Sequence, residues 1–211
     1  MVSKHAQSAG GVGAATRRPR ADALRNRTRL IDAAVAVFAE HGLDVSVARI
    51  AGRAGVGTAT LFRNFPTKDD LIYAVIEARV SELLQIAERA LEVEDPAAAF
   101  EQFLFAVADI QVRDRGFFEA IHSRLIDEPA LLECKLDMTG AGEKILKRAQ
   151  NAGAVRKDVG AEDLRFIVSS AVSHDSAAHP DLHRRYLQIM LDGLRPERAR
   201  PLPVAAPPAQ G

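Results

Sequence analysis

The 211-residue sequence is poor in cysteine and aromatic residues: it has one cysteine, no tryptophan, two tyrosines and 5% aromatic residues. Because Cys134 is the single cysteine, no disulfide can form within the chain, which suits a reducing compartment. No apolar run approaches the roughly 18 residues of a transmembrane helix, and the first twenty residues lack the apolar stretch of a secretory signal. We therefore expect a cytoplasmic protein that does not enter a membrane.

The chemical motifs of enzymes are also missing. The sequence contains no Gly-rich phosphate loop, no nucleophile elbow and no Cys cluster. Two pairs have spacings that place metal ligands on one helix face: His179 with His183, and Glu119 with His122. Neither pair has a third ligand fixed by the sequence, and His179 precedes Pro180 at an expected helix start, where capping or exposure is the commoner role. We expect no catalytic residues, no metal and no other cofactor.

Net charge is zero, with 28 basic and 28 acidic residues, but the charges are unevenly distributed. Residues 1–68 hold eleven Lys or Arg and four Asp or Glu, a net charge of +7, which leaves −7 for the remainder. A neutral total taken alone argues against a nucleic-acid-binding protein. A basic N-terminal third with an acidic remainder, however, would direct DNA to one surface only.

Residues 46–68 (SVARIAGRAGVGTATLFRNFPTK) predict two short helices joined by a tight turn. Ser46 is expected to cap the first helix through its hydroxyl, and Gly55 to end that helix in the left-handed conformation. The second helix should run to Phe65 and stop at Pro66, with Leu61 and Phe65 facing the core. A helix packed at its back and free at its front is what major-groove binding requires.

The free side of the second helix carries small, polar and basic residues. Small side chains in its first turn allow close approach to DNA, Arg63 can donate two hydrogen bonds to guanine, and Asn64 can pair with adenine. Thr67 is expected to cap a further helix. Lys68 then stands beside backbone N–H groups that could bind a phosphate.

The run from about residue 29 to residue 71 resembles the TetR family of transcriptional regulators. The resemblance rests on Ser46, on the Gly55-Val56 turn, on the Thr60-Leu61 pair and on Lys68. It implies DNA contacts from nine residues: Ser46, Val47, Thr58, Ala59, Thr60, Phe62, Arg63, Asn64 and Lys68.

Three positions depart from the commonest family pattern. Gly57 stands where a Ser usually caps the recognition helix, Phe62 where a Tyr usually contacts phosphate, and Asn64 where His or Tyr is frequent. Phe62 lacks the Tyr hydroxyl, so its role becomes packing or van der Waals contact.

The hydrophobic pattern predicts an all-α protein. The resemblance implies that it consists of an N-terminal three-helix DNA-binding domain with a helix-turn-helix and a larger helical-bundle domain for ligand binding and dimerisation. We expect a disordered basic arm over residues 1–20, the DNA-binding domain over 21–68, the effector-binding and dimerisation domain over 69–195, and a disordered tail over 196–211. The arm could reach a DNA groove or could simply be solvated. Gly140 and Gly142 predict a kink or break in one helix of the second domain.

In the family, the second domain encloses a small-molecule cavity and dimerises through its last two helices. The candidate cavity residues mix aromatic and polar side chains: Phe103, Val107, Phe117, Phe118, Ile121, His122, Leu125, Met138 and His174. An aromatic stripe at helical spacing is more often plain core, so both interpretations stay open for each of them. The expected dimer interface lies on helices over 161–173 and 180–194, with Phe166, Ser170, Tyr186, Ile189 and Met190.

We therefore predict a homodimeric transcriptional regulator, a repressor by family expectation, which a small-molecule effector of unknown identity releases from a double-stranded DNA operator. Two alternatives remain open. The helical domain could chiefly bind another protein, or the DNA-binding domain could work without an effector.

Overall fold

The computed structural model of the protein describes residues 17–114, 132–172, 179 and 181–206. These residues form α-helices and one 3-10 helix and contain no strand, which confirms the predicted all-α fold. The helices are α1 (Arg17–His41), α2 (Val47–Ala54), α3 (Thr58–Asn64), α4 (Lys68–Glu92), α5 (Pro96–Arg113), α7 (Leu132–Asn151), α8 (Ala161–Val172) and α9 (Leu182–Gly193), followed by the 3-10 helix η2 (Pro196–Arg198).

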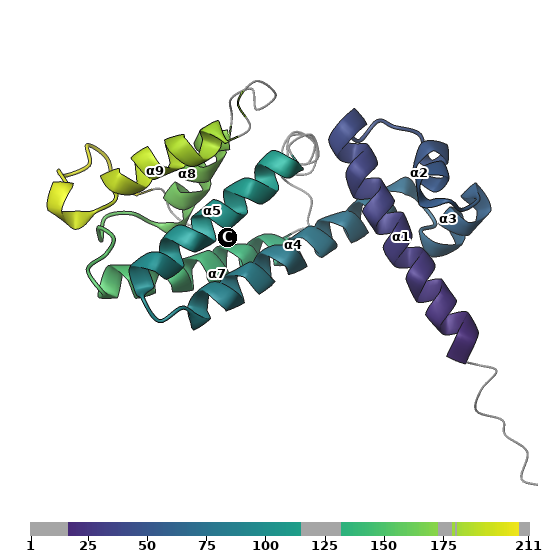
Figure 1. The fold of residues 1–211 in the computed structure, drawn as a ribbon, viewed down its shortest axis with the longest axis horizontal. Coiled ribbons are helices and arrows are strands. Elements are labelled where there is room, and N and C mark those ends of the chain that lie inside the picture. Colours follow the sequence, from purple (N-terminus) through teal and green to yellow (C-terminus); the bar gives the residue numbers. More distant parts are fainter. Residues whose placement is uncertain (1–16, 115–131, 173–178, 180, 207–211) are drawn as a thin grey trace, which may run out of the picture.

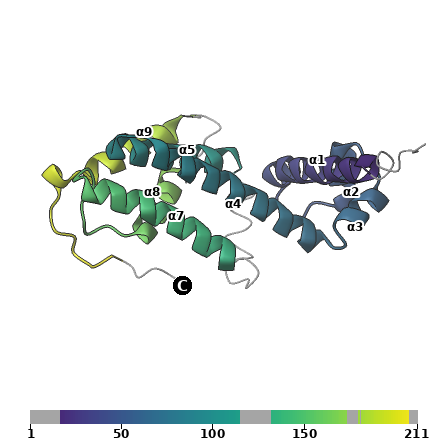
Figure 2. The same cartoon turned by 90° about the horizontal axis from the view of Figure 1, so that it is seen from below.

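The molecule is elongated, with two groups of helices joined by α4. Helices α1, α2 and α3 form a small head at one end, and α5, α7, α8 and α9 form a bundle at the other (Figures 1 and 2). The first half of α4 contributes Leu71 and Val75 to the head core, whereas Ala87 and Ala90 near its end belong to the bundle core. One continuous helix therefore belongs to both hydrophobic cores.

Hydrogen bonds from capping side chains define where α4 and α5 begin. At the start of α4, the Thr67 hydroxyl accepts a hydrogen bond from Asp70 N–H, and the Asp70 carboxylate accepts one from Thr67 N–H. This reciprocal cap confirms the predicted role of Thr67. Helix α5 begins at Pro96, and the Asp95 carboxylate accepts hydrogen bonds from the next free backbone N–H groups.

Three features differ from the sequence-based expectation. Helix α1 begins at Arg17, four residues before the predicted start. Helix α7 is one helix through Gly140 and Gly142, with no break there. The two glycines cost about 1 kcal/mol each in helix propensity, and burial of Ile145 on this helix offsets that cost. Beyond residue 195, the chain forms η2 and is held by a hydrogen bond from the Arg156 guanidinium to the carbonyl of residue 200.

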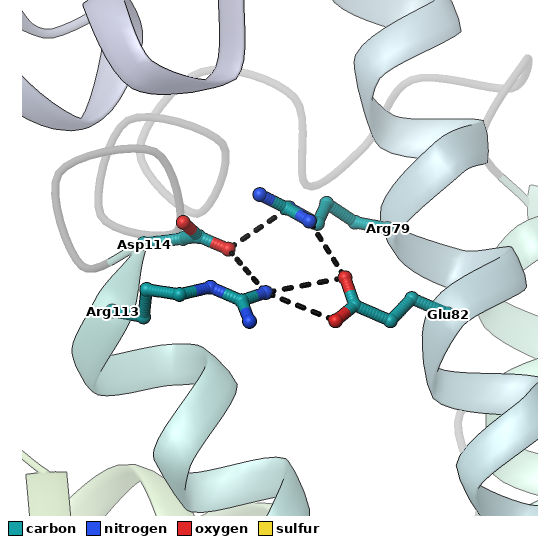
Figure 3. Close-up of polar contacts among 4 residues, drawn as sticks. All are labelled: Arg79, Glu82, Arg113 and Asp114. Carbon is teal, nitrogen blue, oxygen red and sulfur yellow. Dashed lines mark hydrogen bonds and ion pairs between the residues drawn. The ribbon is translucent and has the colours of Figure 1, made fainter. Parts of the chain in front are cut away.

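A four-residue cluster of charges connects the middle of α4 with the end of α5 (Figure 3). Arg79 Nη1 lies 2.6 Å from Glu82 Oε2. Arg79 Nε lies 2.9 Å from Asp114 Oδ2, and this ion pair does not have the geometry of a hydrogen bond. Arg113 Nη2 bridges Glu82 at 3.1 Å and Asp114 at 3.2 Å. Two positive and two negative side chains thus neutralise one another, and Asp114 is only 3% exposed.

The pKa of Glu82 reflects this arrangement. Burial alone would raise the pKa of Glu82, but hydrogen bonds and positive charge from Arg113 and Arg79 outweigh burial and hold the pKa below its ordinary value. Hydrogen bonds and negative charge from Asp114 and Glu82 in turn raise the pKa of Arg113 above its ordinary value, despite the opposing effect of burial. The surroundings therefore favour the ionised forms of Glu82 and Arg113.

Candidate nucleic-acid interface and ligand cavity

The turn between α2 and α3 is set by Gly55. Its backbone is left-handed (φ 67°, ψ 34°), as predicted, and the following residue, Val56, donates its N–H to Ala51 O at 3.0 Å. The guanidinium of Arg29 on α1 donates to Ala54 O at 2.7 Å, across 25 residues of sequence. Arg29 therefore holds the end of α2 in place. In the sequence it is only the last of three alternating arginines, Arg25, Arg27 and Arg29, and this basic run does not indicate that role.

The start of α2 differs in detail from the prediction. Ser46 occupies the capping position with an extended backbone, but its hydroxyl makes no hydrogen bond to the helix. The expected hydroxyl cap was wrong. Ser46 is exposed, while Val47 is half-buried and packs against the head core.

Helix α3 has the predicted buried back and free front. Leu61 is 0% exposed and Phe65, which follows the helix, is 1% exposed. The front carries Thr58, Ala59, Phe62 and Arg63, all exposed, with Phe62 at 46%. Figure 1 shows α3 at the end of the molecule farthest from the bundle, so this front is available to a large partner.

Two polar side chains of α3 are held against their own helix. Arg63 Nη2 donates to Thr60 Oγ1 at 2.9 Å, while its Nε donates to Ala59 O at 3.2 Å. Asn64 is half-buried, and its Nδ2 donates to Thr60 O at 2.8 Å. Asn64 also lines a surface pocket together with Arg27. Its assignment to base contact stays a prediction.

Lys68 is the first residue of α4 and is half-buried. The nearby Asp70 N–H is already bonded to the Thr67 hydroxyl. The Asp70 carboxylate accepts hydrogen bonds from the hydroxyl and the backbone N–H of Thr67, which lower the pKa of Asp70 below its ordinary value. A phosphate at this position would thus meet the Lys68 ammonium and the N–H groups of the first turn that the cap leaves free.

A cavity of about 130 Å³ lies in the bundle, between α4, α5, α7 and α8. It is lined by Leu83, Leu84, Phe103, Leu104, Val107, Gln111, Met138, Thr139, Ala141, Gly142, Ala161, Glu162, Leu164, Arg165 and Val168. Three of the candidate residues, Phe103, Val107 and Met138, are among them. The others, Phe117, Phe118, Ile121, His122, Leu125 and His174, lie outside the described residues.

Sequence reasoning missed the two charged residues of the cavity wall, Glu162 and Arg165. Glu162 is only 7% exposed, and Arg165 Nε donates to its Oε2 at 2.9 Å. The Arg165 guanidinium also lies over the Phe166 ring, 4.3 Å from its centre. Glu162 and Arg165 are three residues apart, a spacing that allows an ion pair on one helix. The apolar stripe of the same helix, however, predicts only a dimer interface.

The outward side of α8 and α9 exposes large apolar side chains. Phe166 is 51% exposed, Tyr186 41% and Ile189 58%, and Ser170 is exposed beside them. Met190 is half-buried and packs against the bundle core. We call Phe166, Tyr186 and Ile189 the apolar face.

The two residues of the candidate metal pair differ in burial: His179 is exposed, whereas His183 is buried. His183 is 4% exposed, and its Nε2 lies 2.8 Å from Asp109 Oδ1 on α5. Burial raises the pKa of Asp109, but hydrogen bonds from His183 and Arg184 outweigh burial and leave the pKa below its ordinary value. Within the described ranges no group of three His, Cys, Asp or Glu side chains could hold a metal ion. Glu119 and His122 fall outside those ranges.

None of the helices in the described part of the chain is long and apolar enough to cross a membrane.

Comparisons with known proteins agree with this arrangement. Residues 30–75 match the family of bacterial regulatory proteins named after TetR, and residues 95–196 match the C-terminal domain of SbtR-like transcriptional regulators. A helix-turn-helix type transcriptional regulator of Staphylococcus aureus (strain USA300) is 44% identical over 59 residues, which are 28% of this chain and 32% of that protein. The match thus spans about a third of the length of this curated relative.

Two solved structures are similar over most of the chain. A TetR transcription regulatory protein from Mycobacterium vanbaalenii is 34% identical, with a TM-score of 0.65 over 84% of this chain and 99% of that one. A TetR transcriptional regulator from Streptomyces coelicolor is 30% identical, with a TM-score of 0.63 over 81% of this chain and 98% of that one. With a helix-turn-helix head matched at one end and a regulator-type bundle at the other, the chain belongs to the TetR family of transcriptional regulators.

Proposed function

We propose that the protein is a homodimeric repressor that binds an operator through α3 and leaves it when a small molecule occupies the bundle cavity. The observation that carries the proposal is the course of α4. Leu83 and Leu84 of this helix line the cavity, and Leu71 and Val75 of the same helix are buried in the head core. A ligand that displaces α4 therefore displaces the head with it.

Support for DNA contact comes from the front of α3 and the start of α4. Thr58 and Ala59 leave room for close approach, Arg63 can reach base edges after leaving Thr60, and Lys68 can neutralise a phosphate. Phe62 offers an apolar surface to the sugar-phosphate backbone or to thymine methyl groups. Ser46 and Val47 at the start of α2 would contact the flanking backbone.

Support for a homodimer comes from the apolar face. Three large apolar side chains exposed together on α8 and α9 would be removed from water by a second copy of the chain. A two-fold dimer could present two α3 helices to successive major grooves, about 34–36 Å apart. An effector that changes this spacing lowers operator affinity without touching α3.

The test is a gel shift with the DNA upstream of the protein's own gene, over a series of salt concentrations. We expect a specific shift that weakens steeply with salt, because phosphate contacts release counterions. Absence of any specific, salt-sensitive shift would reject the proposed function.

Four variants, one of them a control, assign the contacts. Lys68→Ala should weaken binding to all sequences, and Arg63→Ala should relax preference at one base pair at a cost of about 1–3 kcal/mol. Lys144→Ala removes the same charge from the exposed side of α7 and should leave binding unchanged. Asn64→Ala changes preference at one position only if its amide turns outward from Thr60; a loss that is uniform across sequences would reject base recognition by Asn64.

A further inference from the structure

We propose that the ligand of the cavity is an uncharged, mainly apolar molecule of about one ring, which donates a hydrogen bond to Glu162. The inference rests on the proposed function for its regulatory meaning. It rests for its chemistry on the cavity wall alone.

Most of the wall is apolar. Leu83 and Leu84 come from α4, Phe103, Leu104 and Val107 from α5, and Met138 from α7. These six side chains offer no hydrogen bonds to a polar ligand, and the polar lining residues are Gln111, Thr139, Glu162 and Arg165. A polar group on the ligand that faces the six apolar side chains would therefore be desolvated without compensation. The ligand must therefore be largely hydrocarbon.

The charges in the wall disfavour a charged ligand of either sign. Glu162 and Arg165 already compensate each other at 2.9 Å. A carboxylate in the cavity would meet the Glu162 carboxylate, and an ammonium would meet the Arg165 guanidinium, so neither finds an unbalanced opposite charge. A neutral ligand avoids both repulsions.

The Glu162–Arg165 pair nevertheless offers a hydrogen bond in which the protein accepts and the ligand donates. The side chain of Glu162 is 9% exposed, whereas that of Arg165 is 43% exposed and stacks on Phe166. The group embedded in the apolar wall is therefore the carboxylate, and an ionised carboxylate only accepts hydrogen bonds, through two oxygens with spare lone pairs. A hydroxyl or N–H on the ligand is the matching group.

The enclosed space of the cavity has room for about one ring. An apolar cavity of about 150 Å³ is known to hold benzene, and this cavity measures about 130 Å³. A phenol carries the ring and the single donor together. Simple phenols are therefore the probes of choice.

The test measures binding of four probes to the full-length protein by isothermal titration calorimetry. The probes are p-cresol, toluene, benzoate and benzylamine, which share a ring and differ in charge and in the donor. We expect p-cresol to bind at least about tenfold more tightly than toluene, because a hydrogen bond to a charged group contributes about 1.5–3 kcal/mol. Benzoate and benzylamine should bind more weakly than toluene. Tighter binding of either ion than of p-cresol, or no binding of any probe, overturns the proposal.

Two pairs of variants connect the probes to this cavity. Glu162→Gln should remove most of the preference for p-cresol over toluene, while Glu143→Gln on α7, whose carboxylate is likewise paired with a basic neighbour, should keep it. An unchanged preference in Glu162→Gln refutes the role of its carboxylate. Circular dichroism on each variant verifies that the fold is retained.

The second pair compares a leucine that fills the cavity with a leucine on the same helix that does not. A Cβ on Gly142 would lie 3.9 Å from Phe103 Cε1, whereas a Cβ on Gly140 would meet nothing within 4 Å. Gly142→Leu should therefore abolish p-cresol binding, and Gly140→Leu, two residues away on the same helix, should preserve it. Both replacements raise helix propensity, so loss of binding cannot come from unfolding of α7. Equal binding by the two variants places the ligand elsewhere and overturns the proposal.

Failure of this inference can be told from failure of the proposed function. Calorimetry needs no DNA, and the gel shift needs no ligand. A protein that shifts its operator but binds none of the probes has a different effector chemistry. If the protein binds p-cresol through Glu162 but shifts no DNA, the inferred ligand site stands and the proposed repressor function is rejected.

Discussion

Replacing Gly55 by alanine tests how the recognition helix is held. For a residue with a Cβ, the left-handed backbone that Gly55 adopts at φ 67° destabilises the folded state by about 1–2 kcal/mol. Alanine also reduces the conformational freedom of the unfolded chain, which stabilises the folded state by about 0.4–1 kcal/mol. The new Cβ would also lie 3.0 Å from Arg29 Nη2, which must then move away from Ala54 O. Partial loss of that charged hydrogen bond, which contributes about 1.5–3 kcal/mol, brings the expected destabilisation to about 1–3 kcal/mol.

The matched control is Gly57→Ala, two residues further on. Gly57 has an ordinary extended backbone at φ −76°, and a Cβ there meets nothing within 4 Å. We expect it to cost less than about 1 kcal/mol, the difference between Gly and Ala at a helix N-cap. The assay is urea denaturation at one fixed protein concentration, because dimer dissociation would otherwise shift the midpoint.

Equal destabilisation by the two alanines would refute the reasoning. An Arg29→Met background separates the two contributions, since the backbone penalty at Gly55 remains there while the conflict with the guanidinium disappears. In that background Gly55→Ala should cost less than in the wild type. An undiminished cost would show that Arg29 is irrelevant to the effect.

Three further changes test other parts of the fold. Thr67→Ala removes the reciprocal cap of α4 and should lower the free energy of unfolding by about 1 kcal/mol in urea denaturation. Arg148→Met removes the hydrogen bonds to three backbone carbonyls at the end of α4, at 2.6, 2.9 and 3.2 Å, and should cost about 2 kcal/mol; Arg148→Lys should recover only part of this loss. Because the pKa of Glu82 in the folded protein lies below its ordinary value of 4.5, its ion pairs stabilise the fold fully above that pH and lose this effect as pH falls further. Urea midpoints measured between neutral and acidic pH should therefore fall less steeply in Glu82→Gln than in the wild type.

The sequence predicted the features that depend on short-range chemistry. Gly55 ends a helix because few other residues accept its backbone, and Thr67 caps one because its hydroxyl lies within reach of an N–H three residues on. Contacts between distant segments could not be predicted in this way. Arg29 looked like one charge in a basic run, and only the packing of α1 on α2 brings it to Ala54.

The cavity shows the same limit. Phe103 and Val107 were recognisable as an apolar stripe, but whether a stripe faces core or cavity depends on the three other helices that surround it. Glu162 was overlooked because a single helix can serve two surfaces, and the stripe of α8 indicated only one. The continuity of α7 through Gly140 and Gly142 was likewise decided by packing, which a propensity scale does not include.

Helix α8 has a wall of the cavity on one side and part of the apolar face on the other, with Arg165 in contact with both Glu162 and Phe166. If two copies associate through that face, occupation of the cavity and association of the subunits are linked equilibria. A ligand that changes the dimer dissociation constant by some factor must have its own affinity changed by the same factor when the dimer forms. Ligand affinity would then depend on protein concentration, and titrations at nanomolar and micromolar protein would give different dissociation constants for the same molecule.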